Sequence, residues 1–261
     1  MVPYPAVYPL IHLWFLKWIK GIRGIENLQL LEKDKPFLVI ANHPTWFDYI
    51  FQISALAIIL KKEFMVLVDW HVGLAVRCFP ILRPLSKHLK MIFINTKVDC
   101  RLKNVAYLID QMKTRNWSVW IYPRGKEDRP KKARYGASLL ALLTDCQILP
   151  VNIWYDQVSL ERPKGNWINF VFQGLRQLMA TRNKIYLTIG QPYRLSEQSQ
   201  EIEKLLSINY KQLLLGLQKL MTAQGSERVL IGLRQICQKI MVESYLKLTP
   251  TPNNISEFAP L

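Results

Sequence analysis

The chain has 261 residues; half of them are hydrophobic and eight are tryptophan. This composition excludes a disordered chain, and the length suits one large domain, with or without helical additions. The formal net charge is +16, and most of the positive excess lies between Lys61 and Arg134. We therefore expect an anionic partner, such as a phospholipid surface, a phosphate-bearing substrate or nucleic acid. The four cysteines are far apart and form no Cys-x-x-Cys pair, which argues against a zinc site or a disulfide framework.

The first residues are apolar but do not suit a membrane span. Residues 1–16 carry no formal charge, yet three prolines interrupt them and Lys17 follows, so the stretch is too short to cross a bilayer. A signal peptide is not indicated, because the positive charges follow the apolar part. Residues 10–22 predict an amphipathic helix that either lies in a membrane interface, with Trp14 and Trp18 at headgroup depth, or packs on the domain. Residues 21–28 predict a first strand with a turn.

A short stretch in the first quarter of the chain predicts the functional centre. The apolar run at 37–40 predicts a strand buried on both faces, and the uncharged run at 49–60 predicts a core helix. His43 lies between them, at a position where α/β folds tend to build sites. Thr45 and Asp48 have the spacing of a helix capping box, with Asp48 as the third residue of the helix.

Asp48 would then reach back to the imidazole of His43. Such a carboxylate holds one ring N–H and fixes the tautomer, while the other ring nitrogen accepts a substrate proton. His43 and Asp48 are therefore our candidate catalytic residues, with His43 as the general base. The alternative for this stretch alone is an aspartate that only caps a helix and an ordinary turn histidine.

Asn42-His43-x4-Asp48 resembles the first motif of the glycerolipid acyltransferases, the family that includes glycerol-3-phosphate and 1-acylglycerol-3-phosphate acyltransferases. In that family the histidine deprotonates an acceptor hydroxyl, which attacks the thioester of acyl-CoA or acyl-carrier protein. The resemblance implies that Asn42 also lies at the substrate site. It extends upstream, because the Gly-x-Glu-Asn run at 24–27 is similar to a run that precedes this motif in the family.

Residues 92–97 occupy the place of the family's second motif. They predict a strand, as do residues 64–68, and residues 101–115 predict a helix. Thr96 stands where the family has an arginine that is thought to hold the acceptor's phosphate, so the chain departs from the glycerol-3-phosphate pattern here. A neighbouring cation could take over that contact. The candidate substrate-binding residues of this region are Asn95, Lys97 and Arg101.

A predicted strand at 118–121 runs into a loop at the place of the third motif, which is usually Phe-Pro-Glu-Gly-Thr-Arg. The proline and the glycine match, and they shape a tight turn that lets backbone N–H groups approach a ligand. An arginine replaces the glutamate and a lysine replaces the threonine, so the loop favours an anionic group of donor or acceptor, unless its charges are only solvated. The candidate binding residues of this loop are Pro123, Arg124, Gly125, Lys126 and Arg129.

The apolar run at 148–151 matches the fourth motif, which supports the acyl pocket in the family. The helix at 49–60, with the strand around Pro150, is therefore our candidate for the acyl-chain groove, and Pro150 is a candidate binding residue. The four motif matches follow the family order over roughly residues 21–192, about two thirds of the chain.

The remaining sequence predicts two more strands and two long helices. Runs at 167–172 and 184–189 have the composition of strands, while 197–221 and 228–248 have helical periodicity. The last helix either docks on the core or lies on a membrane. The tail from Thr249 is rich in proline, and we expect it to be loose.

Together these runs predict an α/β fold with a mixed, largely parallel central sheet flanked by helices, similar to that of the glycerolipid acyltransferases. An N-terminal amphipathic helix and C-terminal helices complete it. We expect four segments: a membrane-interface segment at 1–24, an acyltransferase α/β domain at 25–195, a helical extension at 196–248 and a loose tail at 249–261.

The resemblance implies an O-acyltransferase that moves a fatty acyl group from acyl-CoA or acyl-carrier protein to a lipid hydroxyl. The acceptor would be a lysophospholipid or glycerol phosphate, or else a glycolipid or pigment. Neither a metal nor a bound cofactor is expected, because a thioester is already activated. We expect a peripheral protein on the cytoplasmic side of an anionic membrane. Two alternatives are a non-catalytic membrane-binding protein that keeps the scaffold and a nucleic-acid binder; the latter is indicated by charge alone, without a recognisable binding motif.

Overall fold

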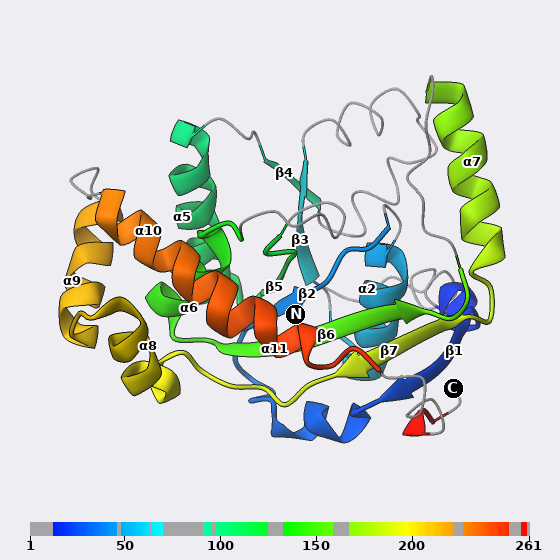
Figure 1. Cartoon of the computed structure of the whole chain (residues 1–261), viewed down its shortest axis with the longest axis horizontal. Coiled ribbons are helices and arrows are strands. Elements are labelled where there is room, and N and C mark those ends of the chain that lie inside the picture. The colour runs from blue at the N-terminus through cyan, green and yellow to red at the C-terminus, as the bar shows by residue number, and fades with distance from the viewer. Residues whose placement is uncertain are drawn as a thin grey trace.

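A central sheet organises the structure (Figure 1), which is a computed structural model that describes residues 13–45, 48–62, 64–69, 91–94, 98–124, 133–158, 167–221, 227–250 and 257–259. Its strands within these residues are β1 (Ile19–Arg23), β2 (Phe37–Ala41), β3 (Phe64–Asp69), β4 (Met91–Ile94), β5 (Ser118–Ile121), β6 (Gln147–Tyr155) and β7 (Ile185–Ile189). Their order is β1-β7-β6-β2-β5-β3-β4. The pair β6 and β7 is antiparallel, and all other neighbouring pairs are parallel. The predicted mixed, largely parallel sheet is confirmed.

The central strand β2 shows why the sheet is covered on both faces. Its five residues are all buried. Leu38 and Ile40 belong to one hydrophobic core, whereas Phe37, Val39 and Ala41 belong to the other. Side chains alternate between the two faces of a strand, so an unbroken apolar run is stable only between two layers. The strand predicted at 37–40 is confirmed.

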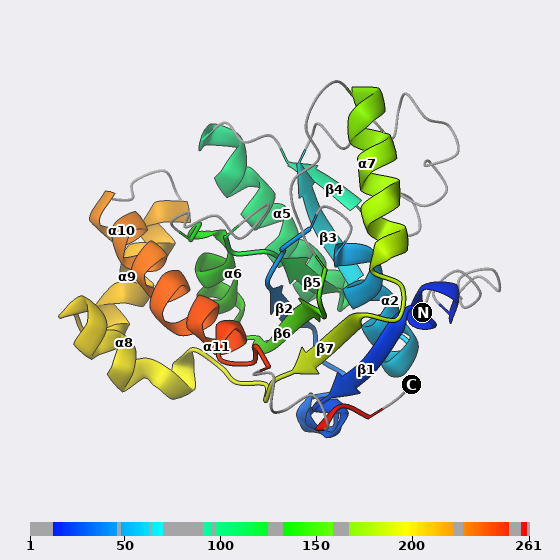
Figure 2. The same ribbon diagram turned by 45° about the vertical axis from the view of Figure 1, so that its right-hand side comes forward.

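Helices form these two layers (Figures 1 and 2). They are α2 (Asp48–Leu60), α5 (Val98–Arg115), α6 (Gly136–Thr144), α7 (Trp167–Ala180), α8 (Ser199–Leu206), α9 (Tyr210–Met221), α10 (Glu227–Ile236) and α11 (Glu243–Leu246), with short 3-10 turns η1 (Ile25–Leu30) and η2 (Ser196–Gln198) and a π turn η3 (Cys237–Val242). The core around Phe51 and Leu56 of α2 covers one face; the core that α5, α6 and α8 to α11 share covers the other. No helix among the described residues is long and apolar enough to cross a membrane.

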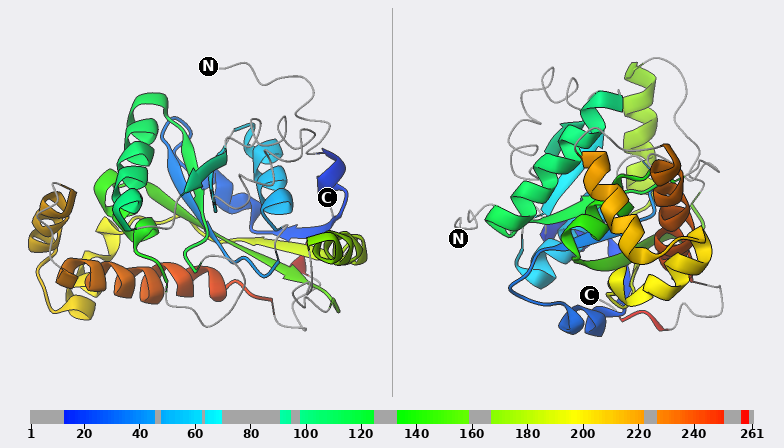
Figure 3. Two further views of the ribbon diagram at one scale, coloured as in Figure 1. Left: turned by 90° about the horizontal axis from the view of Figure 1, so that it is seen from above. Right: turned by 90° about the vertical axis from the view of Figure 1, so that its left-hand side faces the viewer.

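The C-terminal helices dock on the core. Leu217 of α9 and Leu233 of α10 are fully buried in the same cluster as Ile40. Seen from above, α10 and α11 run along the sheet on the side away from α2 (Figure 3). Docking, the first of the two alternatives for the helix predicted at 228–248, is therefore confirmed. The helix predicted at 197–221 is divided into η2, α8 and α9; the break between α8 and α9 is at Ser207, which adopts a left-handed conformation with φ 52°.

The strand predicted at 167–172 is wrong, because these residues begin α7. A short apolar run fits a buried strand or one side of a helix equally well. Here the sequence continues to Ala180 without a proline, so the longer helix forms and connects β6 to β7. Phe172 is exposed on α7, which a strand buried in the sheet would not allow.

The N-terminal helix is shorter than predicted. Residues 13–16 are helical, but β1 begins at Ile19 and pairs with β7, so the helix predicted over 10–22 is wrong from that point. Trp18 is buried and packs against Phe51 with ring centroids 6.0 Å apart, so packing on the domain, the second of the two alternatives for this stretch, is confirmed for Trp18. Trp14, in contrast, is 54% exposed. The strand predicted at 21–28 gives way to η1 after Arg23.

Part of the tail is bound rather than loose. Ala259 and Ile22 exchange two backbone hydrogen bonds of 3.0 and 3.1 Å, and Arg23 forms an ion pair of 2.5 Å with Glu257. β1 lies at the edge of the sheet, where unpaired backbone groups accept another chain segment. The expectation of a loose tail is therefore wrong for residues 257–259.

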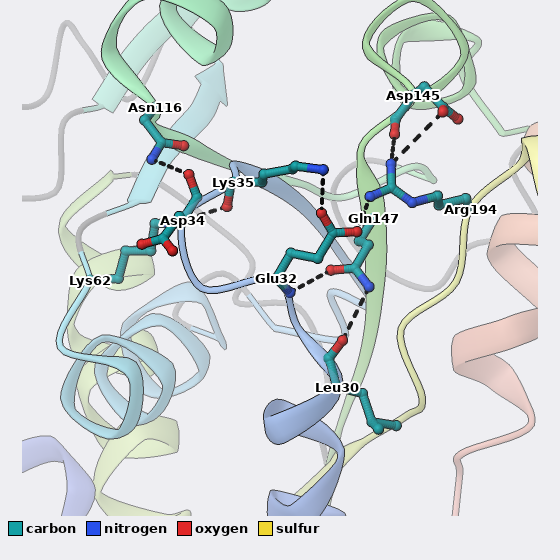
Figure 4. A network of polar contacts seen from close by, with 9 residues as sticks. All are labelled: Leu30, Glu32, Asp34, Lys35, Lys62, Asn116, Asp145, Gln147 and Arg194. Atoms are coloured by element: carbon teal, nitrogen blue, oxygen red, sulfur yellow. Dashed lines mark hydrogen bonds and ion pairs between the residues drawn. The ribbon is translucent and has the colours of Figure 1, made fainter.

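A polar network joins the segments at the N-terminal ends of β2 and β6 (Figure 4). Glu32 accepts from Arg194 and lies 2.6 Å from the ammonium of Lys35. Arg194 also donates to the carbonyl of Asp145, while Gln147 contacts the backbone of Glu32 and Leu30. The segment after β7 is thereby tied to the loop before β2.

Gly24 makes the turn between β1 and η1. Its φ of +81° lies in the left-handed region, and a Cβ added there would lie 2.0 Å from the carbonyl oxygen of Ile189. Asn27 donates to the same carbonyl over 2.8 Å. Only glycine allows η1 to approach the end of β7 this closely.

We expect Gly24→Ala to destabilise the fold by about 2 kcal/mol or more, because it combines backbone strain with a clash against a main-chain atom. Urea unfolding measures this change. Gly136→Ala is the matched control, since a Cβ at that position meets nothing within 4 Å and lies at the start of α6. Equal stability of the two variants would contradict the role of Gly24.

The stability that the Glu32 carboxylate contributes to the fold depends on pH. Hydrogen bonds from Lys35 and Arg194 lower the pKa of Glu32. A carboxyl whose pKa is lower in the folded chain stabilises the fold above its unfolded pKa of about 4.3, and this contribution disappears as pH falls through the folded value. Glu32→Gln should therefore be less stable than wild type at pH 7 and equal to it in strong acid. Urea unfolding between these pH values tests this, with Glu26→Gln on the exposed side of η1 as control; a constant difference would contradict it.

Candidate active site

His43 lies just beyond the C-terminal end of β2. The neighbouring strands β5 and β6 are parallel to β2, with Ile40 paired to both Ile121 and Pro150. Because parallel strands end on the same side of a sheet, the residues that follow β2 and β5 and the last residue of β6 meet there. These residues are His43, Tyr122 and Tyr155.

Asp48 is the first residue of α2, and its side chain is completely buried. Both the backbone N–H and the hydroxyl of Thr45 donate to its carboxylate. The reciprocal half of the predicted capping box is thus present, because the aspartate receives the N–H of Thr45, and the hydroxyl of Thr45 also binds the carboxylate. The hydroxyl of Tyr155 is a further donor to Asp48.

The predicted contact between the two candidate catalytic side chains is present. Nδ1 of His43 lies 3.1 Å from Oδ2 of Asp48. A carboxylate only accepts hydrogen bonds, so Nδ1 is the donor of this contact, and in the neutral imidazole Nε2 is the nitrogen with a free lone pair. The His43 side chain remains 13% exposed, whereas that of Asp48 is not exposed at all. This arrangement suits a general base whose tautomer is fixed from the buried side.

Tyr122 holds the imidazole from another direction. The rings of His43 and Tyr122 are stacked, with centroids 4.3 Å apart and an angle of 20° between the planes. The Tyr122 hydroxyl donates to Oε1 of Gln52 over 2.8 Å, and Nε2 of Gln52 donates to the carbonyl of Asn42 over 3.3 Å. Burial, with the charge of Asp48, raises the pKa of Tyr122 well above its usual value, so the phenol remains a donor.

Asn42 takes a positioning role instead of the predicted substrate contact. Its side chain is buried, accepts from the N–H of Ile153 over 2.7 Å and donates to the carbonyl of Ile153 over 2.8 Å. Both polar ends are therefore used to extend the pairing of β2 and β6 by one more residue. This pairing fixes the position of the backbone where the turn to His43 begins.

The basic loop begins beside the imidazole. Pro123 is buried, and its carbonyl accepts from the N–H of Arg134 over 2.9 Å, which closes the base of the loop. Arg124 is half-buried, and its Nε has no hydrogen-bond partner among the described residues. The remaining predicted residues of the loop, Gly125, Lys126 and Arg129, lie outside the described residues.

Of the other predicted binding residues, the structure describes the side chain of Pro150 alone. Asn95 and Lys97 lie outside the described residues, and Arg101 is in α5, where the described part does not include its side chain. The ring of Pro150 lies with Leu248 around Gly190, in the layer of C-terminal helices. α2 packs with Leu149 and Val151 on the opposite face of the same strand, so the structure brings the predicted helix and strand together but turns the ring of Pro150 away from α2.

Sequence reasoning missed Tyr155 and Gln52. Tyr155 had no signal, because nothing in the chain shows that β6 lies next to β2. Gln52 did have one: it is the single amide in the uncharged run at 49–60, four residues after Asp48 and hence on the same side of the helix. A buried amide requires partners, which here are Tyr122 and the backbone of Asn42.

A comparison with family models identifies the family of this chain. A family model described as Acyltransferase matches residues 22–154. A Caenorhabditis elegans protein, provisionally named a 1-acyl-sn-glycerol-3-phosphate acyltransferase, is 25% identical over 165 residues, which are 59% of this chain and 59% of that protein. The match thus spans less than two thirds of the relative. The crystal structure of PlsC, a 1-acyl-sn-glycerophosphate acyltransferase from Thermotoga maritima, superposes with a TM-score of 0.44 and 16% identity, over 83% of this chain and 76% of PlsC.

Proposed function

This chain belongs to the acyltransferase family, and from that premise we propose that it transfers a fatty acyl group from acyl-CoA or acyl-carrier protein to a hydroxyl of a lipid acceptor. The observation that carries the proposal is the pair of His43 and Asp48, in which Nδ1 is held by a buried carboxylate and Nε2 is left to act as a base. Neither a metal nor a bound cofactor is required, because the thioester is already activated.

The proposed reaction proceeds in two balanced steps. Nε2 of His43 takes the proton of the acceptor hydroxyl while the oxygen forms a bond to the thioester carbonyl carbon, whose C=O π pair moves onto the carbonyl oxygen. The tetrahedral oxyanion then re-forms the C=O bond and breaks its C–S bond, and the departing thiolate takes the proton from the imidazolium. The products are an ester and the free thiol, and His43 returns to its starting state. Asp48 stabilises the imidazolium between the two steps.

The acceptor is proposed to be of the lysophospholipid or glycerol-phosphate type. The name of the Caenorhabditis elegans relative supports a 1-acylglycerol phosphate. Arg124 supports an anionic group near the base, because this half-buried residue follows Tyr122 by two positions and its buried Nε has no hydrogen-bond partner within the described part of the chain. Thr96 stands at the place of the family arginine, so a glycolipid or pigment hydroxyl is the alternative acceptor.

We further propose that the protein binds the cytoplasmic face of an anionic membrane peripherally. Leu13 and Trp14 support this, since they are 43% and 54% exposed on the short N-terminal helix. Lys17 and Lys20 are exposed just after them. Exposed indole beside ammonium groups suits the boundary between acyl chains and anionic headgroups.

His43→Ala should lower kcat by roughly 10²-fold or more, the usual scale for loss of a general base. Turnover is measured by mass spectrometry of the ester product, with acyl-CoA and acyl-carrier protein as donors and lysophosphatidic acid, other lysophospholipids and a glycolipid as acceptors. Leu30→Ala is the control, because this exposed residue lies at the opposite end of β2 from His43. Undiminished turnover by His43→Ala would contradict the mechanism, and liposome binding without transfer to any acceptor would favour a non-catalytic scaffold.

Trp14→Ala should weaken binding to vesicles of phosphatidylglycerol and phosphatidylcholine by about tenfold, since it removes a large exposed apolar surface. Co-sedimentation over a lipid titration gives the affinity. Leu30→Ala again serves as control, because Leu30 is 55% exposed but lies in η1, at the other end of β1. Equal affinities of the two variants would contradict a membrane role for the N-terminal helix.

A further inference from the structure

Tyr155 donates to the same carboxylate that faces the imidazole. Its hydroxyl contacts Oδ1 of Asp48, while Oδ2 of Asp48 lies 3.1 Å from Nδ1 of His43. We propose that Tyr155 is a positioning residue: its hydroxyl fixes the Asp48 carboxylate in the orientation that holds the His43 ring ready to take the acceptor's proton. This inference rests on the proposed function, in which His43 is the base.

Tyr155 differs from the other donors to Asp48 in where it comes from. Thr45 supplies two hydrogen bonds from within the same turn, three residues before Asp48. Tyr155 is 107 residues away in the chain, at the last position of β6. A carboxylate held by its own turn alone moves with that turn. The bond from Tyr155 fixes the carboxylate relative to the sheet, and therefore relative to the end of β2, where His43 begins.

Tyr155 has little freedom itself, which a positioning group requires. Its backbone pairs with Ile185 of β7, and its side chain is 6% exposed in the core that it shares with Phe51 of α2. Burial and the nearby charge of Asp48 raise the pKa of the Tyr155 phenol well above its usual value. The hydroxyl therefore stays protonated and serves as a donor over the whole working pH range.

The expected effect follows from the strength of the contact. A hydrogen bond to a buried carboxylate belongs to the stronger, charge-assisted class. Its loss leaves the carboxylate with one donor fewer and the imidazole with more than one orientation. We expect kcat to fall by about 10- to 100-fold. KM should change by less than about twofold, because Tyr155 acts through Asp48 rather than on substrate.

Tyr155→Phe tests this, since it removes one hydroxyl and keeps the packed ring. Tyr186→Phe is the matched control: Tyr186 is a buried tyrosine on the adjacent strand, and it packs against Trp154 and Phe258 instead of the site. Thermal unfolding of both variants shows whether the fold is kept. The proposal expects a fall in kcat for Tyr155→Phe alone.

A second measurement does not depend on turnover. Proton–nitrogen NMR of the imidazole shows which ring nitrogen carries the proton, and His43→Gln assigns the signals of His43. We expect wild type and Tyr186→Phe to keep the proton on Nδ1 and Tyr155→Phe to show a mixture of tautomers. If Tyr155→Phe does not fold, 3-fluorotyrosine at position 155 keeps the contact with a more acidic donor, and the His43 signals should shift.

The outcomes separate the two proposals. A wild-type protein without acyl transfer to any acceptor overturns the proposed function, and the imidazole spectra still decide the role of Tyr155. The positioning role is overturned if the His43 spectra of wild type and of Tyr155→Phe are the same, whatever the activity. If only the fluorotyrosine protein folds, a His43 spectrum equal to that of wild type overturns the positioning role. A changed tautomer together with a fall in kcat at constant KM supports it.

Discussion

The carboxylate of Asp48 is the group on which the arrangement of this site depends. It is removed from water completely, and a buried carboxylate is stable only when donors replace the lost hydration. Thr45, Tyr155 and His43 provide those donors, from the turn, the end of β6 and the end of β2. Because the buried charge needs these donors, three parts of the chain are held in one geometry around Asp48. The imidazole of His43 is oriented as a result.

The sheet makes this meeting possible. β2, β5 and β6 are parallel and covered by helices on both faces, so the ends of the strands are where polar groups can gather. Asn42 extends the pairing of β2 with β6 by one residue, and Tyr122 follows β5 directly onto the face of the His43 ring. The loop that begins after Tyr122 therefore starts beside the imidazole of His43.

Much of the fold could be predicted because its elements are local and strongly patterned. The buried run of β2, the uncharged run of α2 and the spacing of α5 agree with the structure to within three residues at each end. The strand prediction fails at the start of α7, because a short apolar run gives the same hydrophobic pattern in a buried strand and on one side of a helix. The N-terminal helix ends earlier than predicted, since pairing with β7 overrides the helical pattern from Ile19 onward.

By itself, the sequence determined the contact between His43 and Asp48, because five residues across a single turn leave little choice of geometry. Only the tertiary structure decided that Tyr155 completes this pair, that Gln52 holds Tyr122, and that Pro150 lies on the other face of the sheet from α2. The contacts of Tyr155 and Gln52 join residues that are 107 and 70 positions apart in the chain. The place of Pro150 depends on which face of β6 turns toward α2. The order of strands in the sheet settles both, and that order results from packing the whole core rather than from any local run of residues.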